Sequence, residues 1–228
     1  MGAAEMDELL TNEQSKSLFE EVVFADRYAA RRCLQRMATA QGVPRALSVA
    51  LRPLLRSLCT AADADRALVN LERFTQSVSD PVALWEYLGS NPRVIEKLVT
   101  LFAGSQFLAE ILLRNPDHVE RWAEHKRLAQ PKSGSRFLGD ARAALSGFES
   151  GGEDVIPLVQ YDALRIFQRN ELLRIGTCDL LDLFDFPTVV GQLSCLAESL
   201  VTICLELVSA HIGMAADGFA VIALGKLG

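Results

Sequence analysis

The sequence is poor in the residues that break or cross-link a chain. It has only 15 Gly and 8 Pro among 228 residues, too few for a collagen-like or low-complexity protein. Its cysteines are odd in number and no two have CxxC spacing, so we expect reduced, buried thiols. The N-terminus lacks a basic stretch followed by an apolar one, so no signal sequence is evident and we expect a cytoplasmic protein. The cysteines are Cys33, Cys59, Cys178, Cys195 and Cys204.

Basic charge is also scarce. The chain has 23 Lys and Arg against 29 Asp and Glu, a formal net charge of −6, and no basic face suited to nucleic acid is evident. The most apolar region, residues 193–224, is interrupted by Glu198, Glu206, His211 and Asp217. No run of ~18 uncharged residues exists to span a bilayer. We therefore expect neither nucleic acid nor a membrane as a partner.

Half of the residues are hydrophobic, and before residue 213 they recur at helical spacing. Thr11 with Gln14 forms a capping-box pattern that predicts a helix running to Gly42. Pro53 is expected to kink or interrupt the second helix, and a third is predicted over 63–78.

Short helices follow, each opened by a capping side chain and, in three cases, a proline. The cap accepts an N–H that has no partner inside the helix, and proline at the first helical position has no N–H to lose. The predicted starts are Asp80-Pro81, Asn91-Pro92, Asn115-Pro116 and Gly104-Ser105.

Residues 130–154 are rich in Pro, Ser and Gly, which predicts two loops around a short helix near 136–148. A long helix is predicted from about Val155, interrupted at Gly176, with a turn or short helix over 179–184. The last helix is predicted over 188–211, its start capped by residues 186–188.

After Gly213 the pattern changes. Residues 219–224, Phe-Ala-Val-Ile-Ala-Leu, form a short apolar run bounded by glycines, which favours a buried strand over a helix. A buried strand needs ladder partners, and the sequence offers no other convincing strand, which suggests a truncated sheet. The fold class expected is therefore mainly all-α, a helical bundle leading into a first β-strand. The expected domains are 1–60, 61–212 and 213–228.

Residue types that carry chemistry are present, but each has a structural interpretation. His118, His125 and His211 lack the ligand spacing of a zinc site, and Asp179, Asp182 and Asp185 fit a solvated helix face better than a metal site. Ion pairing between helices is favoured over phosphate binding for Arg165, Arg169 and Arg174. GxSxG, HExxH, GxGxxG and a complete P-loop are absent.

Four ordered motifs carry a resemblance to a known family. They are residues 101–116, residues 170–176 with 179–181 after them, residues 193–198, and the ending at 219–228. Together they resemble glutamine synthetase adenylyltransferases, the two-headed enzymes that add AMP to a tyrosine of glutamine synthetase and remove it. The resemblance covers about residues 64–228.

The resemblance implies that 219–228 opens an α+β nucleotidyltransferase fold. Gly225, Lys226, Leu227 and Gly228 would begin its nucleotide loop. The family's Ser-Asp-x-Asp acids, which bind Mg²⁺ and organise ATP, ADP or phosphate, have no counterpart in this chain. The resemblance also implies control by a PII-type signal protein and glutamine. The position of the motifs resembles the first, deadenylylating head.

The chain is thus expected to be a fragment of that enzyme, inactive by itself and without bound cofactor. Two alternatives stay open. One is a non-catalytic helical interaction module that docks on glutamine synthetase or another subunit. The other is an unrelated helical scaffold whose motif matches arose by chance.

Overall fold

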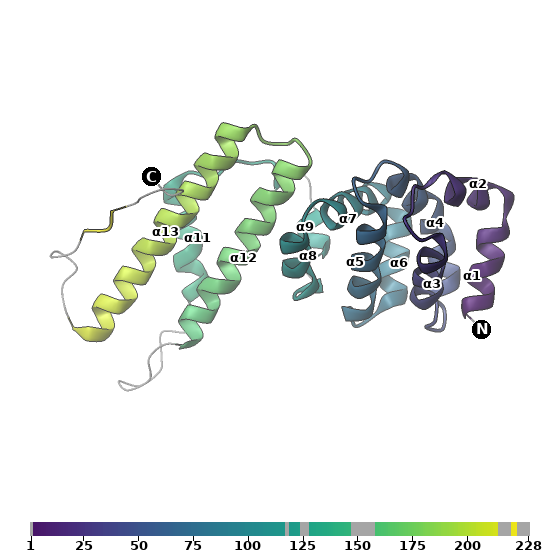
Figure 1. The fold of residues 1–228 in the computed structure, drawn as a ribbon. Helices are drawn as coiled ribbons and strands as arrows, with labels where there is room; N and C mark the ends of the chain where they lie inside the picture. Colours follow the sequence, from purple (N-terminus) through teal and green to yellow (C-terminus); the bar gives the residue numbers. More distant parts are fainter. Residues whose placement is uncertain (1, 117–118, 124–127, 147–157, 214–219, 223–228) are drawn as a thin grey trace. The chain divides into compact units, whose positions relative to one another are not determined.

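A computed structural model describes residues 2–116, 119–123, 128–146, 158–213 and 220–222. The described residues are helical with connecting loops, and none of them lies in a strand (Figure 1). The mainly all-α prediction is therefore confirmed. The chain divides into two units, Met1–His125 and Lys126–Gly228, which are considered separately.

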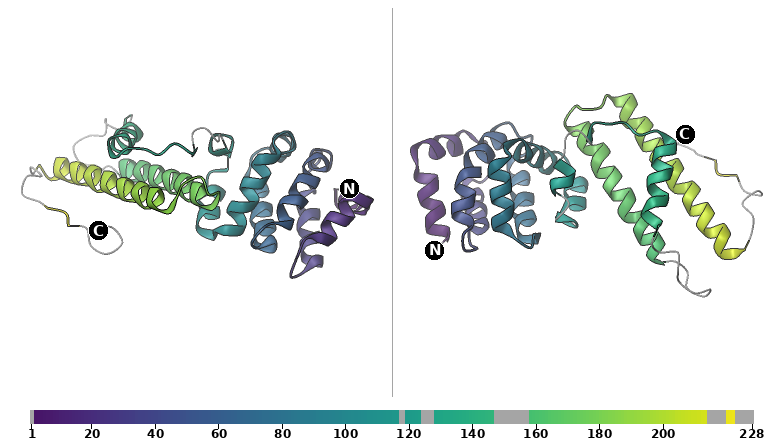
Figure 2. Two further views of the ribbon diagram at one scale, coloured as in Figure 1. Left: turned by 90° about the horizontal axis from the view of Figure 1, so that it is seen from above. Right: turned by 180° about the vertical axis from the view of Figure 1, so that it is seen from behind.

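The first unit is an array of helices in which α1 to α5 each pack on the helix two positions further along the chain. α1 contacts α3, α3 contacts α5 and α5 contacts α7, while α2 contacts α4 and α4 contacts α6. This alternation produces two layers of helices (Figures 1 and 2). The helices are α1 (Gly2–Thr11), α2 (Glu13–Glu21), α3 (Arg27–Met37), α4 (Val43–Cys59), α5 (Ala64–Ser77), α6 (Pro81–Ser90), α7 (Pro92–Gly104), α8 (Gln106–Leu113) and α9 (Val119–Ala123).

The core of this unit lies between the two layers. Trp85 of α6, Phe74 of α5 and Phe102 of α7 are fully buried, and the Phe74 and Phe102 rings are 5.8 Å apart. Short helices are unstable alone, so this shared apolar contact is what holds them. α4 contributes leucines on one face, namely Leu47, Leu51, Leu54, Leu55 and Leu58.

Local capping signals are confirmed at two of the four predicted starts, Asp80 and Ser105. Asp63, Asp80 and Ser105 accept hydrogen bonds from backbone N–H groups in the first turn of α5, α6 and α8. Asn91 precedes Pro92 at the start of α7, but its side chain donates instead to the Tyr87 carbonyl. The start predicted at Asn115-Pro116 stays a prediction, because residues 117 and 118 lie outside the described residues and α9 is described only from Val119.

The first long helix predicted from the sequence is wrong in two respects. Asn12, not Thr11, caps α2, and the Thr11 hydroxyl donates to the Glu8 carbonyl at the end of α1. A break follows α2 because the Asp26 carboxylate accepts from the Tyr28 and Ala29 N–H groups and starts α3. The Ala25 N–H donates to Asp65 across 2.8 Å, a contact made 40 residues away that local spacing cannot reveal.

Neither Pro53 nor Gly176 interrupts its helix, so the predicted interruptions are wrong, while a kink at Pro53 stays a prediction. α4 continues through Pro53, because the buried leucines of its flanking turns pack on α6 and α7. α12 continues through Gly176, and the neighbouring Thr177 and Cys178 are buried. A glycine inside a helix costs only about 1 kcal/mol, less than the burial around it contributes.

The second unit contains three helices that contact one another: α11 (Gly134–Leu145), α12 (Leu158–Leu180) and α13 (Phe186–Ile212). α12 and α13 lie side by side with α11 against them (Figure 2). The short helix and the last helix are thus confirmed. Asp182 adopts φ 51 in the turn after α12, and Asp185, rather than residues 186–188, caps α13.

Half of the predicted strand at 219–224 lies outside the described residues. Ala220–Ile222 are described and have no regular secondary structure, while 219, 223 and 224 are not described. α13 ends at Gly213, which adopts the left-handed conformation with φ 64.

The break between α2 and α3 depends on the Asp26 cap, which can be tested by substitution. Asp26→Ala removes the acceptor for two N–H groups and should lower the free energy of unfolding by about 1 kcal/mol. Asp26→Asn keeps a capping oxygen and should cost much less. Urea unfolding followed by circular dichroism measures both, and equal losses for the two variants would contradict the capping role.

Candidate functional site

The residues predicted to begin a nucleotide loop, Gly225, Lys226, Leu227 and Gly228, lie outside the described residues. The structure therefore gives no geometry for that loop. His118 and His125 also lie outside, and His211 is exposed near the end of α13. Within the described ranges, no group of three or more His, Cys, Asp or Glu side chains is arranged to hold a metal ion.

The three aspartates predicted to face solvent do so. Asp179 and Asp182 are exposed, and Asp185 caps α13 by accepting from the Thr188 N–H at 3.0 Å. The hydrogen bonds from Thr188 hold the pKa of Asp185 below its ordinary value. Asp185 therefore begins α13, while Asp179 and Asp182 lie exposed at the end of α12 and in the turn after it.

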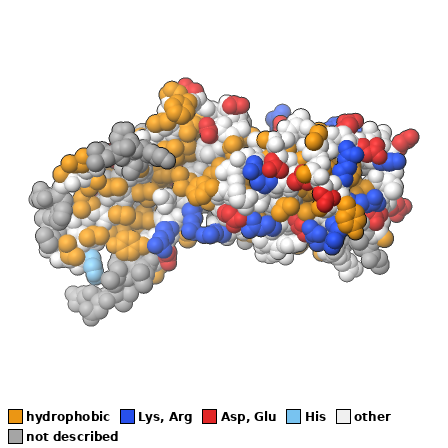
Figure 3. Space-filling model, in the orientation of Figure 1, with side chains coloured by type: hydrophobic (Ala, Val, Ile, Leu, Met, Phe, Trp, Pro, Cys, Tyr) orange, Lys and Arg blue, Asp and Glu red, His pale blue; other side chains and the backbone are white. Residues whose placement is uncertain are grey.

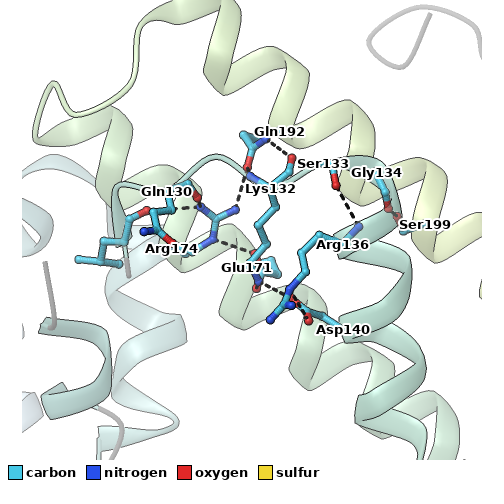
Figure 4. Close-up of polar contacts among 11 residues, drawn as sticks. Gln130, Lys132, Ser133, Gly134, Arg136, Asp140, Glu171, Arg174, Gln192 and Ser199 are labelled. Carbon is cyan, nitrogen blue, oxygen red and sulfur yellow. Dashed lines mark hydrogen bonds and ion pairs between the residues drawn. The ribbon is translucent and has the colours of Figure 1, made fainter. Parts of the chain in front are cut away.

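The arginines of α12 differ in how far they are buried. Arg165 is exposed and pairs with Asp162 on its own helix at 3.3 Å. Arg174 is only 8% exposed and lies among polar groups from three segments of the second unit. It is the centre of the principal buried polar cluster of the described residues there, which we call the α12 clasp: Lys132, Asp140, Glu171, Arg174 and Gln192 (Figure 4).

Every nitrogen of the Arg174 guanidinium has an acceptor. Nε donates to Glu171 at 2.8 Å, Nη2 donates to Gln192 at 3.0 Å, and Nη1 reaches the carbonyl oxygens of Leu128 and Gln130 at 3.4 and 3.3 Å. The planar fork of arginine suits several acceptors at fixed angles. Arg174 thereby ties the segment before α11 to α12 and α13.

Lys132 completes the clasp from the other side of Glu171. Its Nζ donates to Glu171 at 2.6 Å and to Asp140 at 2.9 Å. Its backbone N–H donates to the Gln192 side-chain oxygen at 2.8 Å, and its carbonyl accepts from the Gln192 amide at 2.7 Å. Asp140 also pairs with the exposed Arg136 at 3.0 Å, so both carboxylates of the clasp are shared between cations, and both amide ends of Gln192 are used.

The clasp rests on an aromatic ring. Phe137 of α11 is fully buried, and its ring centroid lies 5.6 Å from Lys132 Nζ and 5.7 Å from the Arg174 guanidinium carbon. A cation over an aromatic face gains more when it is desolvated. With its charges paired and the ring beneath, the clasp has the character of a structural centre and offers no open anion site.

A second polar cluster, in the first unit, joins α3 to α5. Glu72 accepts from the Cys33 thiol at 2.7 Å and from both Nε and Nη2 of Arg36. Burial raises the pKa of Cys33 to about 12, so its thiol is protonated and unreactive at neutral pH. The hydrogen bonds from Arg36 hold the pKa of Glu72 below its ordinary value.

Sequence reasoning found only part of the clasp. Arg174 was recognised as a candidate for ion pairing between helices, but its carboxylate partner Glu171 lies three residues earlier on the same helix. Lys132 and Gln192, which are 60 residues apart, were missed. The available signal was a glutamine at a buried position of α13, in the row Val189, Gln192, Leu196, Ser199 and Ile203.

Replacing Arg174 should destabilise the second unit strongly. Arg174→Met leaves the Leu128 and Gln130 carbonyls and part of Glu171 without a donor, which should cost about 3–5 kcal/mol. Arg165→Met on the same helix removes an exposed pair and should cost ~1 kcal/mol or less. Urea unfolding measures both, and a similar small loss in the two variants would show that the clasp contributes little.

The Glu72 cluster predicts a pH-dependent difference in stability. A carboxyl whose folded pKa is lowered contributes stability above its unfolded pKa, and this is lost as pH falls through the folded pKa. Glu72→Gln should therefore cost about 1–3 kcal/mol at pH 7. The difference in the free energy of unfolding between this variant and the parent protein should decrease below pH 4.5, the ordinary pKa of the carboxyl. Unfolding measured from pH 7 to pH 3 tests this, and a gap independent of pH would refute it.

Comparison with known proteins identifies a family that the chain resembles. Residues 95–228 match the family model described as glutamate-ammonia ligase adenylyltransferase. Three relatives are named bifunctional glutamine synthetase adenylyltransferase/adenylyl-removing enzyme. The protein of Leifsonia xyli is 26% identical over 223 residues (96% of this chain), that of Mycobacterium leprae 28% over 191 residues (81%), and that of Pasteurella multocida 29% over 153 residues (63%).

The chain spans only a small part of these relatives: 21% of the Leifsonia protein, 18% of the Mycobacterium protein and 15% of the Pasteurella protein. The matched stretch includes α8, the α12 clasp, α13 and the glycine-rich ending. Since the family model covers more than half of the sequence, the chain belongs to the glutamate-ammonia ligase adenylyltransferase family.

Proposed function

We propose that this chain is part of an enzyme that adenylylates and deadenylylates a tyrosine of glutamine synthetase, and that it comes from the deadenylylating head. The observation that carries the proposal is the family match over residues 95–228. Relatives aligned along most of the chain carry both activities in their names. Glutamine synthetase is accordingly the proposed target, with a PII-type protein and glutamine as regulators in the cytoplasm.

In this proposal the helices support the domain, and residues 219–228 begin the part of the domain that binds phosphate. The run at 219–224 would be the first strand of a nucleotidyltransferase sheet, and Gly225, Lys226, Leu227 and Gly228 would begin the loop that meets phosphate. Glycines suit that role because backbone N–H groups approach a phosphate closely where no Cβ intervenes. The regions 61–212 and 213–228 would be the helical lead-in and the opening of that domain.

Mg²⁺ and ATP, ADP or phosphate belong to the proposed reaction, but the 228-residue sequence contains no Ser-Asp-x-Asp motif to hold the metal. Nucleotidyl and phosphoryl transfer depend on positioning and on stabilisation by metal charge. The described residues form no metal-binding group, so no step through the metal is assigned to them. We expect the chain alone to have no activity.

The purified chain gives the first test. Incubated with AMP-modified glutamine synthetase, phosphate and Mg²⁺, it should release no ADP, because the metal-binding acids are missing. ADP release that stops on adding EDTA would overturn this expectation. Binding of glutamine synthetase without ADP release is compatible with either the fragment or a non-catalytic interaction module.

A genetic measurement separates those two functions and identifies the head. Deleting the gene segment that encodes this chain should raise the AMP-modified fraction of glutamine synthetase, since the deadenylylating activity is lost. Intact mass spectrometry of glutamine synthetase from the same cells measures that fraction. A fall would point to the adenylylating head, and an unchanged fraction would count against the proposed function.

A further inference from the structure

α4 presents a row of arginines to solvent. Arg45, Arg52 and Arg56 are exposed, and they share one face of the helix with the exposed Val49. At 3.6 residues per turn, successive spacings of four, three and four residues place these side chains one above another. α4 carries no acidic residue, so the row is uniformly positive.

Other helices of the first unit use their arginines to hold neighbours. Arg31 and Arg36 of α3 and Arg73 of α5 pair with acids of adjacent helices. Figure 3 shows basic and acidic side chains next to one another on the face of this unit that it draws. The arginines of α4 form no ion pair with any residue that the structure describes, so they are available for other contacts.

Two hollows lie between α4 and the helices beside it, and together we call them the α2–α4 groove. The first, of about 490 Å³, is lined by Glu8 from α1 and by Arg45 from α4. The second, of about 400 Å³, is lined by Glu13 from α2 and by Arg52 and Arg56 from α4. Among the residues that line the groove, the wall from 8–18 has no cation and the wall from 42–56 has no acid.

A groove with walls of opposite charge is complementary to a second copy of itself. In an isologous dimer the same patch of both copies meets across a two-fold axis. An axis that runs along the groove exchanges the two walls and keeps each residue at its level. Arg45 of one copy then faces Glu8 of the second copy, since both line the first hollow. In the second hollow, Arg52 and Arg56 face Glu13 in the same way.

We propose that the α2–α4 groove is an interface between two copies of this chain, related by a two-fold axis along the groove. Exposed ion pairs contribute little free energy by themselves, so apolar contact has to accompany them. Val49 is 64% exposed in the middle of the arginine row, and Leu9 and Leu18 are half-buried in the two hollows. The pairing is therefore weak, reversible and sensitive to salt. It does not depend on the proposed enzymatic function.

An acidic segment of a different protein is the competing occupant, because it would be attracted to the arginine row. The opposite wall argues against it. Glu8 and Glu13 line the same two hollows, and like charges brought together at an interface disfavour binding. A basic segment meets the same difficulty at the arginines. A second copy of the chain offers an opposite charge to both walls at once.

Analytical ultracentrifugation of the full chain gives the first test. In low salt, the weight-average mass should rise from 25.0 kDa toward twice that value as the protein concentration increases. In ~1 M salt, charges are screened beyond about 3 Å, and association should be much weaker.

Two charge-reversal variants test the arrangement. Arg52→Glu/Arg56→Glu brings acids against Glu13 of the second copy, and Glu13→Arg brings cations against the arginine row. Each should weaken association by about tenfold or more, because like charges then meet. Mixed together, the two variants should associate, since opposite charges meet in both halves of a mixed pair.

A matched control changes the same number of arginines elsewhere in the first unit. Arg32 of α3 and Arg93 of α7 are exposed and do not line the groove. Arg32→Glu/Arg93→Glu should therefore associate as the parent chain does. Circular dichroism checks that the helices of every variant remain folded.

Three results would overturn the proposal. A parent chain that stays at 25.0 kDa at every concentration in low salt has no such interface, and binding of poly-glutamate by that monomer would assign the row to another protein. Undiminished association of the groove variants would place the contact elsewhere. Variants that lose association and do not regain it on mixing would exclude the two-fold arrangement. No nucleotide or glutamine synthetase is present, so the outcome is independent of the proposed activity.

Discussion

The second unit depends on one electrostatic constraint, which is the presence of Glu171 and Arg174 in the buried face of α12. A charge removed from water costs several kcal/mol unless a partner and hydrogen bonds replace its hydration. The partners come from elsewhere: Lys132 and two carbonyl groups from the segment before α11, and Gln192 from α13. These helices therefore have few ways to come together, because a shifted register would leave a buried charge unpaired.

In the first unit, the alignment of the helices depends on ion pairs, most of them exposed, and on a larger apolar core. Ion pairs join Asp7 to Arg31, Arg36 to Glu72, and Arg73 to Glu110, linking α1 to α3, α3 to α5, and α5 to α8. The side chains of the Asp7–Arg31 and Arg73–Glu110 pairs are about 40% exposed, so each of these two pairs adds little free energy. Glu72 is buried, and its pair with Arg36 contributes more. The stability comes from the buried leucines and aromatic rings, and the pairs favour one alignment of neighbouring helices.

Features that depend on residues close together in the sequence could be predicted from it, and features that depend on residues far apart could not. The caps at Asp80 and Ser105 act within one helical turn, and local pattern located them correctly. Pro53 and Gly176 were misjudged because tertiary burial outweighs a local penalty. Arg174 of the clasp could be told from Arg165 only in the fold, because Arg174 is buried and Arg165 is exposed. The hydrogen bond between Lys132 and Gln192 could not be predicted, because the two residues are 60 positions apart.

The clasp also fixes the orientation of α13. One face is fixed by Gln192, whose amide is bonded at both ends, so α13 has a defined rotation about its axis. That rotation decides which apolar side chains of α13 remain exposed, among them Val201, Val208 and Ile212. The buried charge of Arg174 therefore acts beyond its own helix, because its hydrogen bond to Gln192 fixes the rotation of α13.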